Sequence, residues 1–94
     1  MIPDFEWDPR KAASNLTKHG VGFAEAVTVF RDPQARIVPD PRHSVGEERL
    51  AILGQSERGR LLSVMFTERG TRIRLISARK ATRRERNDYE EDPS

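Results

Sequence analysis

The sequence of 94 residues predicts one small α+β domain, in which a small antiparallel sheet packs with two N-terminal helices and one C-terminal helix. Three observations predict this class. Two similar turn sequences, at residues 57–60 and 68–71, separate three runs with the composition of β-strands. Helix signals stand before these runs and after them. The length leaves little room for a second domain, so we expect residues 1–94 to form one unit.

The N-terminal quarter predicts a short strand and then a helix. Phe5, Glu6 and Trp7 have the composition of a strand. Asp8 can accept hydrogen bonds from free amides at a helix start, and Pro9 loses no needed donor at the first helical position. Gly20 can adopt the left-handed conformation that ends a helix. We therefore expect a helix from about residue 9 to 19.

A second helix is predicted directly afterwards. Its apolar residues recur with helical spacing and form one face, at Phe23, Ala26, Val27 and Phe30. Asp32 and Pro33 end this pattern. Residues 33–48 are rich in proline, aspartate and glycine and predict a loop, with one further short strand possible at residues 35–38.

The middle of the sequence predicts an antiparallel meander of three strands, at residues 49–55, 61–67 and 72–78. Each turn between them contains a glycine that can adopt a positive φ. The second run is apolar on both faces, which indicates a central strand. In the third run, Ile73 and Leu75 share one face and Arg72 and Arg74 share the other.

A capping box predicts the last helix. Thr82 and Glu85 have the spacing in which each side chain binds the other residue's amide, so we expect a helix from about residue 83 to 90. Acidic residues follow at its negative pole. We therefore expect residues 90–94 to form a frayed acidic tail.

The composition excludes several classes of protein. The sequence has no cysteine, so it forms no disulfide and no thiolate metal site. Its apolar runs are too short to span a membrane, and its first residues lack the pattern of a signal peptide. We therefore expect a cytoplasmic protein.

The net charge of +2 conceals an uneven distribution. Residues 58–86 contain 10 basic and 2 acidic side chains, whereas residues 87–94 contain 4 acidic side chains and no basic one. An arginine-rich segment is typical of proteins that bind a polyanion such as nucleic acid. The alternative is an ordinary solvated surface.

Motifs distributed along nearly the whole chain resemble the BrnT family in order and spacing. They begin with the string at residues 5–8 and continue through Asn15, residues 18–21, Phe23, Glu25, Ala26, Phe30, Asp32, Gly46, Glu47, Arg49, Arg74, residues 76–79, Ala81, Glu85 and Tyr89. The resemblance implies a toxin of a type II toxin–antitoxin module with a fold like that of RelE-type ribonucleases. It also implies an antitoxin partner of the BrnA type, which carries a DNA-binding domain, and a hetero-oligomeric complex that binds its own operator DNA through the antitoxin.

The chemistry of a ribonuclease toxin agrees with the residues present. Cleavage of RNA without a metal needs a base for the ribose 2′-hydroxyl, an acid for the leaving oxygen, and fixed cations for the charged transition state. Arginine suits the last role because it stays charged and can bind phosphate through two hydrogen bonds. The sequence contains no metal-binding motif with ligand spacing. We expect a metal-independent endoribonuclease that inhibits translation and needs no cofactor.

The arginines at the end of the sheet are the first candidates for the site. We expect Arg72, Arg74, Arg79 and Lys80 to bind RNA phosphate, and we favour Arg74 and Arg79 for catalysis because both lie in the motif. The alternative is that these cations form ion pairs with Glu85, Glu47 or Glu48, which stabilise a protein little at a surface.

The other candidates carry the acid–base chemistry. His19 has the side chain that most readily exchanges a proton near neutral pH, although it can also cap its helix. Glu47 fills the motif with Arg49 and can act as the base, or it can orient Arg49 instead. Tyr89 can donate a proton or stack on a base, or it can pack against the sheet.

Two rival functions use the same cations. A nucleic-acid-binding module without catalysis needs only the phosphate contacts. A protein-interaction subunit can place the same arginines against an acidic partner.

Overall fold

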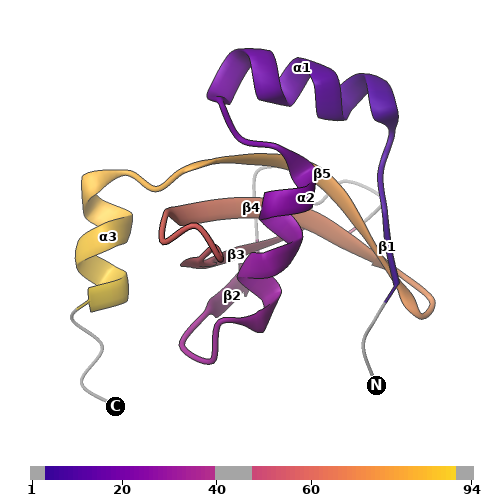
Figure 1. The fold of residues 1–94 in the computed structure, drawn as a ribbon. Helices are drawn as coiled ribbons and strands as arrows, with labels where there is room; N and C mark the ends of the chain where they lie inside the picture. Colours follow the sequence, from indigo (N-terminus) through magenta and orange to yellow (C-terminus); the bar gives the residue numbers. More distant parts are fainter. Residues whose placement is uncertain (1–3, 40–47, 91–94) are drawn as a thin grey trace.

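The computed structural model describes residues 4–39 and 48–90 (Figure 1). Its elements are, in chain order, β1 (Asp4–Glu6), α1 (Pro9–His19), α2 (Phe23–Thr28), the 3₁₀ turn η1 (Val29–Arg31), β2 (Arg36–Pro39), β3 (Leu50–Gln55), β4 (Leu61–Arg69), β5 (Arg72–Lys80) and α3 (Arg83–Glu90). The predicted α+β class and the predicted number of helices are thereby confirmed for this part of the chain.

Within the described residues, five strands form one sheet in the order β1-β5-β4-β3-β2. The meander of β3, β4 and β5 is antiparallel, as predicted, and β2 adds an antiparallel strand at one edge. The first strand differs from the expectation of an antiparallel sheet because β1 pairs parallel to β5, with Phe5 opposite Ile73. This pairing places Phe5 against the core.

The ends of α1 follow the predicted signals. The side chain of Asp8 accepts a hydrogen bond of 2.8 Å from the amide of Arg10, and Pro9 is the first helical residue. Gly20 ends the helix at φ 70° and donates its amide to the carbonyl of Leu16. Cations in the last turn of α1 suit the negative pole of its dipole.

The core lies between α2 and one face of the sheet. Three rings link the sequence-distant parts of it, with Phe30 edge-to-face against both Phe5 and Phe66 at centroid distances of 5.0 Å. The fully or nearly fully buried apolar residues are Val21, Phe23, Ala26, Val29, Ile52, Leu61, Leu62, Val64, Phe66, Leu75 and Ala78. Burial of this set supplies the main favourable free energy of folding.

A register shift in β5 sets the directions of its side chains. Met65 of β4 pairs with Ser77, whereas the next residue, Phe66, pairs with Leu75, so Ile76 is an extra residue in β5. Simple alternation would place Arg74 and Arg79 on opposite faces of the sheet. The shift instead places Arg72, Arg74, Ser77 and Arg79 on the same face, opposite the buried core.

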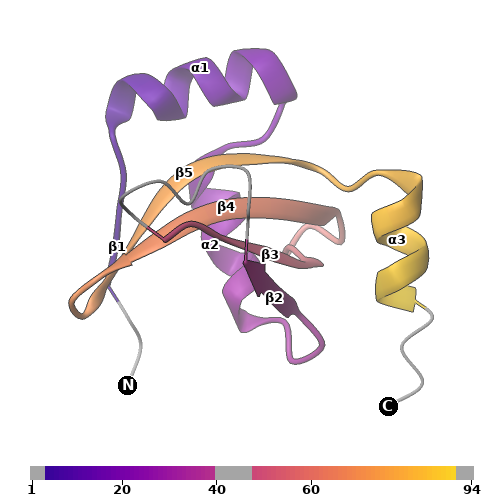
Figure 2. The ribbon, with the colours of Figure 1, turned by 180° about the vertical axis from the view of Figure 1, so that it is seen from behind.

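The C-terminal helix α3 lies at the end of the sheet, apart from α1 and α2 (Figures 1 and 2). The predicted capping box is present, since Glu85 donates its amide to Thr82 Oγ1 and its own carboxylate accepts from the amide of Thr82. None of residues 83–90, all of which the structure describes, is buried. Most of the expected acidic tail, residues 91–94, lies outside the described residues. None of the helices in the described segments is long and apolar enough to cross a membrane.

Candidate nucleic-acid interface

We call the sheet surface opposite the core the arginine face; it carries Arg72, Arg74 and Arg79 from β5 and Arg36 from β2. Two cross-strand rows define it. One row runs from Arg79 through Ser63 and Leu53 to Arg36. The other includes Arg74 and Thr67, and between the two rows lie Ser77, Met65, Ala51 and Val38.

Arg79 and Glu85 form a two-bond fork at the junction of β5 and α3. The two guanidinium nitrogens of Arg79 donate to the two carboxylate oxygens of Glu85 at 2.7 and 3.0 Å. The Arg79 side chain is 43% exposed and that of Glu85 is 28% exposed, so solvent reaches both. The hydrogen bonds from Arg79 hold the pKa of Glu85 below its usual value, and the same contact raises the pKa of Arg79.

A cavity of about 240 Å³ opens beside this fork. It is lined by Arg36, Val38, Ala51, Leu53, Ser63, Glu85 and Asp88. The lining combines an apolar floor from β2 and β3 with the cation and two carboxylates at its rim. A floor of this kind can accept the flat side of a sugar or base, while the Arg79–Glu85 fork holds the charged groups beside it.

Arg74 and Arg72 lie at the opposite end of β5 and face β1. Arg74 donates to Glu6 at 2.8 Å, and Arg72 lies 3.7 Å from the same carboxylate. The position of Glu6 follows from the parallel pairing of β1, which places it directly opposite Arg74. The ion pairs predicted as the alternative to phosphate binding therefore exist, although Glu6 was not among their expected partners.

The four predicted phosphate-binding cations do not form one cluster. Ser63 and Thr67, the β4 partners of Arg79 and Arg74, are four residues apart, which corresponds to about 13 Å along the strand. Lys80 pairs with Leu62, whose side chain is in the core, so Lys80 leaves the strand on the other face. The arginine face thus offers two separate cationic positions.

Arg49 belongs to the same region as Arg74. It directly precedes β3, and the carbonyl of Glu48 accepts a hydrogen bond from Thr67 Oγ1 at 2.8 Å. Leu50 packs on the core, so alternation along the strand directs Arg49 towards the face of Thr67 and Arg74. Glu47, the predicted base, lies outside the described residues.

His19 lines a different cavity from the one beside the Arg79–Glu85 fork. It is exposed at the end of α1 and lines a shallow cavity of about 180 Å³ between α1 and β5. His19 is not among the residues that line the cavity beside the Arg79–Glu85 fork.

Tyr89 attaches α3 to the turn before β2. Its hydroxyl donates to Asp32 Oδ2 at 2.5 Å, and the same oxygen accepts the amide of Gln55 at 2.8 Å. Burial, reinforced by the carboxylate of Asp32, raises the pKa of Tyr89 to about 12. Burial also opposes ionisation of Asp32, but the hydrogen bonds from Gln55, Tyr89 and Gln34 outweigh it and hold the pKa of Asp32 below its usual value. Tyr89 is therefore neutral near pH 7, and its hydrogen bond to Asp32 holds α3 against the turn before β2.

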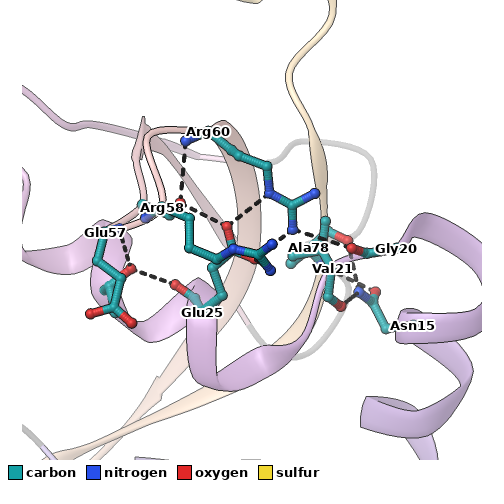
Figure 3. A network of polar contacts seen from close by, with 10 residues as sticks. Asn15, Gly20, Val21, Glu25, Glu57, Arg58, Arg60 and Ala78 are labelled. Atoms are coloured by element: carbon teal, nitrogen blue, oxygen red, sulfur yellow. Dashed lines mark hydrogen bonds and ion pairs between the residues drawn. The ribbon is translucent and has the colours of Figure 1, made fainter.

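The most buried ion pair of the described residues was not predicted. Glu25 of α2 is 8% exposed and accepts two hydrogen bonds from Arg60, one of them at 2.9 Å, and one from Ser56 at 2.7 Å (Figure 3). Arg60 also donates to the carbonyl of Gly20. The hydrogen bonds from Arg60 hold the pKa of Glu25 low against the opposing effect of burial. This network fixes α2 to the β3–β4 turn.

Asn15 fixes α1 to β5, as Glu25 fixes α2 to the β3–β4 turn. Its side-chain amide donates to the carbonyl of Ala78 at 2.8 Å and accepts the amide of Ala78 at 3.0 Å, as a neighbouring strand would (Figure 3). It also donates to the carbonyl of Val21. Asn15 thereby satisfies the edge of β5 beyond the short strand β1.

No group of three or more histidine, cysteine, aspartate or glutamate side chains that could hold a metal ion occurs in residues 4–39 and 48–90. Arg79 and Arg74, two of the predicted site residues, are bound to the side chains of Glu85 and Glu6. The described site therefore consists of arginines, carboxylates and hydroxyl groups.

Comparisons with known proteins concern the family and the fold. Residues 7–85 match the family model of the ribonuclease toxin BrnT of type II toxin–antitoxin systems. The fold is similar to the 1.1 Å crystal structure of the ribonuclease toxin BrnT of Brucella abortus, with a TM-score of 0.68 and 25% identity over 86% of this chain and 99% of that one. No curated protein matches the chain.

Proposed function

The chain belongs to the BrnT family of ribonuclease toxins of type II toxin–antitoxin systems, and from this premise we propose that it is a metal-independent endoribonuclease whose cleavage site is the arginine face. The observation that carries the proposal is the Arg79–Glu85 fork beside an open cavity. The reaction is attack of a ribose 2′-oxygen on the adjacent phosphorus, with departure of the 5′-oxygen of the next nucleotide.

Arg79 is the proposed transition-state stabiliser. Its guanidinium already binds two coplanar oxygens of Glu85, and two phosphate oxygens offer the same geometry. Because the side chain is 43% exposed, RNA can replace the carboxylate without opening the core. A cation fixed against the developing negative charge of the phosphorane lowers the barrier to cleavage.

Arg74 and Arg49 are proposed to hold a neighbouring phosphate. They lie in the second cationic position, on either side of Thr67. Arg72 adds charge at the same end of β5. Contacts at a second phosphate align the reacting group, because they fix the strand on both sides of the bond that breaks.

Two carboxylates are candidates for the base that accepts the 2′-hydroxyl proton. Glu47 is supported by the family resemblance, and Glu85 by its position against Arg79. The low pKa of Glu85 keeps it ionised near neutral pH, as a base must be. Single-turnover cleavage by Glu47→Gln and by Glu85→Gln compares the two candidates. Because Glu85 also binds Arg79, a slower Glu85→Gln variant identifies the base only if the pH profile of cleavage changes as well, whereas a loss confined to Glu47→Gln assigns the base to Glu47.

The decisive experiment is RNA cleavage in the presence of EDTA with analysis of the product ends. The proposal expects 2′,3′-cyclic phosphate and 5′-hydroxyl ends, undiminished by the chelator. Arg79→Ala should abolish cleavage, while Arg84→Ala, which removes an exposed cation of α3, should not. Loss of wild-type activity in EDTA, or full activity of Arg79→Ala, would refute the proposed mechanism.

We also propose a partner and a cellular role that rest on the family. An antitoxin of the BrnA type would form a hetero-oligomeric complex with this protein and bind operator DNA, and the free toxin would inhibit translation in the cytoplasm. The exposed cations of the arginine face support an antitoxin that covers them with acidic side chains. Titration of the toxin with its BrnA-type antitoxin should stop RNA cleavage at a fixed stoichiometry.

A further inference from the structure

The cavity between α1 and β5 has a lining that the proposed cleavage reaction does not use. We call it the helix groove; it is lined by Lys11, Ser14, Asn15, Lys18, His19, Ile76 and Ser77. Four of the lining residues have the i, i+3, i+4, i+7 spacing that places them on the face of α1 turned towards β5: Lys11, Ser14, Asn15 and Lys18. Ile76 and Ser77 come from the register shift of β5.

The charge of the helix groove is of one sign. Lys11 and Lys18 approach it from the two ends of α1, and His19 adds an imidazole. Among the described residues, no carboxylate lines this cavity, and residues 9–19 contain no acidic side chain. Ser14 and Ser77 supply hydroxyl groups between the cations. Neighbouring cations repel one another, so an anion that enters the groove is attracted by all of them.

The size of the groove favours a backbone phosphate over a small-molecule ligand. Its volume of about 180 Å³ is below the roughly 300–1,000 Å³ of typical ligand pockets. Asn15, its amide residue, is already committed to the backbone of Ala78 and Val21 and so is not available to read a base. The other polar groups of the lining are ammonium groups, hydroxyl groups and the imidazole of His19, all of which can bind phosphate without regard to sequence.

The groove adjoins the arginine face at Ser77. This residue lines the groove and, as the partner of Met65, lies on the arginine face between Arg74 and Arg79. A nucleic-acid strand that crosses the arginine face can therefore continue over the edge of β5 onto α1 (Figure 1).

We propose that the helix groove binds a backbone phosphate of the RNA strand outside the cleaved linkage, held by Lys11, Lys18 and the hydroxyl groups of Ser14 and Ser77. The inference rests on the proposed function, because it extends the path of the same substrate. The groove raises affinity for RNA and takes no part in the chemical step.

The test measures binding of a 2′-O-methyl RNA, which cannot be cleaved because it lacks the attacking hydroxyl. An oligonucleotide of about 12 residues is long enough to span both surfaces. The double variant Lys11→Ala/Lys18→Ala should weaken binding roughly tenfold at low salt and reduce the slope of log affinity against log salt by about 0.7, the value for one lost phosphate contact of a single strand. Cleavage of a dinucleotide substrate, too short to reach the groove, should keep its rate.

A matched control separates the groove from general charge. Arg10→Ala/Arg84→Ala removes the same number of charges from exposed positions of α1 and α3 that do not line the groove. This variant should lose less than about twofold in affinity. Equal losses in the two double variants, or no loss in either, would overturn the inference, and so would a groove variant impaired only in binding its antitoxin.

The outcomes also distinguish the inference from the proposed function. A wild-type protein that binds the 2′-O-methyl RNA through the groove but leaves unmodified RNA intact would refute the ribonuclease proposal and support the groove. A wild-type protein that cleaves RNA while the groove variant binds and cleaves long RNA normally would support the ribonuclease and refute the groove.

Discussion

Two arginine–glutamate forks of the same chemistry differ in exposure: the Arg60 and Glu25 side chains are 26% and 8% exposed, and those of Arg79 and Glu85 are 43% and 28% exposed. The Glu25–Arg60 pair lies under the β3–β4 turn, where Glu25 is 8% exposed and also accepts from Ser56 (Figure 3). The Arg79–Glu85 pair lies at the start of α3, where both side chains are in contact with solvent and Glu85 otherwise binds only its own capping box. In each, two guanidinium nitrogens donate to one carboxylate.

From this difference we expect burial, and not the type of contact, to separate a structural pair from an exchangeable one. Removing a partner from a buried pair leaves polar groups without hydrogen bonds in a place that water does not reach, which is costly. An exposed pair is worth little because water and other ions replace either partner. The proposed function requires Arg79 to release Glu85 for phosphate, whereas release of Glu25 by Arg60 should loosen α2.

The largest expected effect comes from making the same change in both pairs. Arg79→Ala should lower the rate of RNA cleavage by at least roughly 100-fold, or about 3 kcal/mol in transition-state stabilisation, because one fixed donor to the phosphorane is lost. Its melting temperature should stay near that of the wild type. Arg60→Ala should do the reverse, lowering the melting temperature while the folded fraction cleaves RNA normally. Cleavage assays beside thermal melts of both variants measure this.

The opposite pattern would contradict the assignment of Arg79 to catalysis and of Arg60 to stability. If Arg79→Ala melted far below the wild type, its fork would be structural, and a catalytic role would no longer follow from loss of activity. Arg79→Lys keeps the charge but not the fork, so cleavage that is restored by lysine would show that charge alone suffices.

The next effect concerns Asn15, which belongs to the buried side of the comparison. Asn15→Leu keeps the approximate volume but leaves the amide and carbonyl of Ala78 without their side-chain partner in a buried place. We expect the free energy of unfolding to fall by about 2 kcal/mol. Thr17→Ala, on the exposed side of α1, is the control and should change it little. Urea denaturation measures both values, and equal stabilities would show that Asn15 is dispensable.

Local signals predicted much of the fold around these pairs. The cap at Asp8, the αL glycine at Gly20 and the Thr82–Glu85 box depend on residues within four positions of one another, and all three are present. The meander followed from two glycine turns, and both Gly59 and Gly70 have positive φ. Caps and turns of this kind can be predicted from a single sequence because they depend on neighbouring residues and not on distant parts of the chain.

Long-range pairings were not predicted, for physical reasons. Glu25 and Arg60 are 35 residues apart, and Tyr89 and Asp32 are 57 apart, so only the folded topology brings them together. The extra residue Ile76 has no local signature, yet it decides that Arg74 and Arg79 share a face. The arginines of the candidate site were therefore named from the sequence, but their division into two positions was not.

A smaller effect distinguishes the two pairs by pH. Because Arg60 holds the pKa of Glu25 low in the folded state, the ionised carboxylate stabilises the fold above the pKa of the unfolded chain, and this contribution is lost as the pH falls through the folded value. Glu25→Gln should cost about 1.5 kcal/mol at neutral pH and flatten the loss of stability below about pH 5. Glu85→Gln, in the exposed pair, should flatten it less. Melting temperatures from pH 7 to 3 measure this, and equal flattening would contradict the contrast in burial.

The smallest effect tests whether Tyr89 positions α3 or acts on the substrate. Tyr89→Phe removes the hydrogen bond to Asp32 but keeps the ring, so stability should fall by about 1 kcal/mol and RNA cleavage should fall less than about threefold. A loss of cleavage as large as that of Arg79→Ala, without loss of stability, would instead make Tyr89 a proton donor.

The alkaline behaviour of Tyr89 gives an independent measurement of the same contact. Its folded pKa is raised to about 12, so the protonated phenol stabilises the fold below the unfolded value near 10, and this contribution is lost as the pH rises towards 12. Tyr89→Phe should lose less stability than the wild type over that interval. Tyr89 is the only tyrosine of the sequence, so ultraviolet titration of the phenolate reports on it directly. A phenol that ionises near pH 10 in the folded protein would show that α3 is not attached to Asp32 in solution. The whole of α3, and not only the Arg79–Glu85 pair at its start, would then be held weakly.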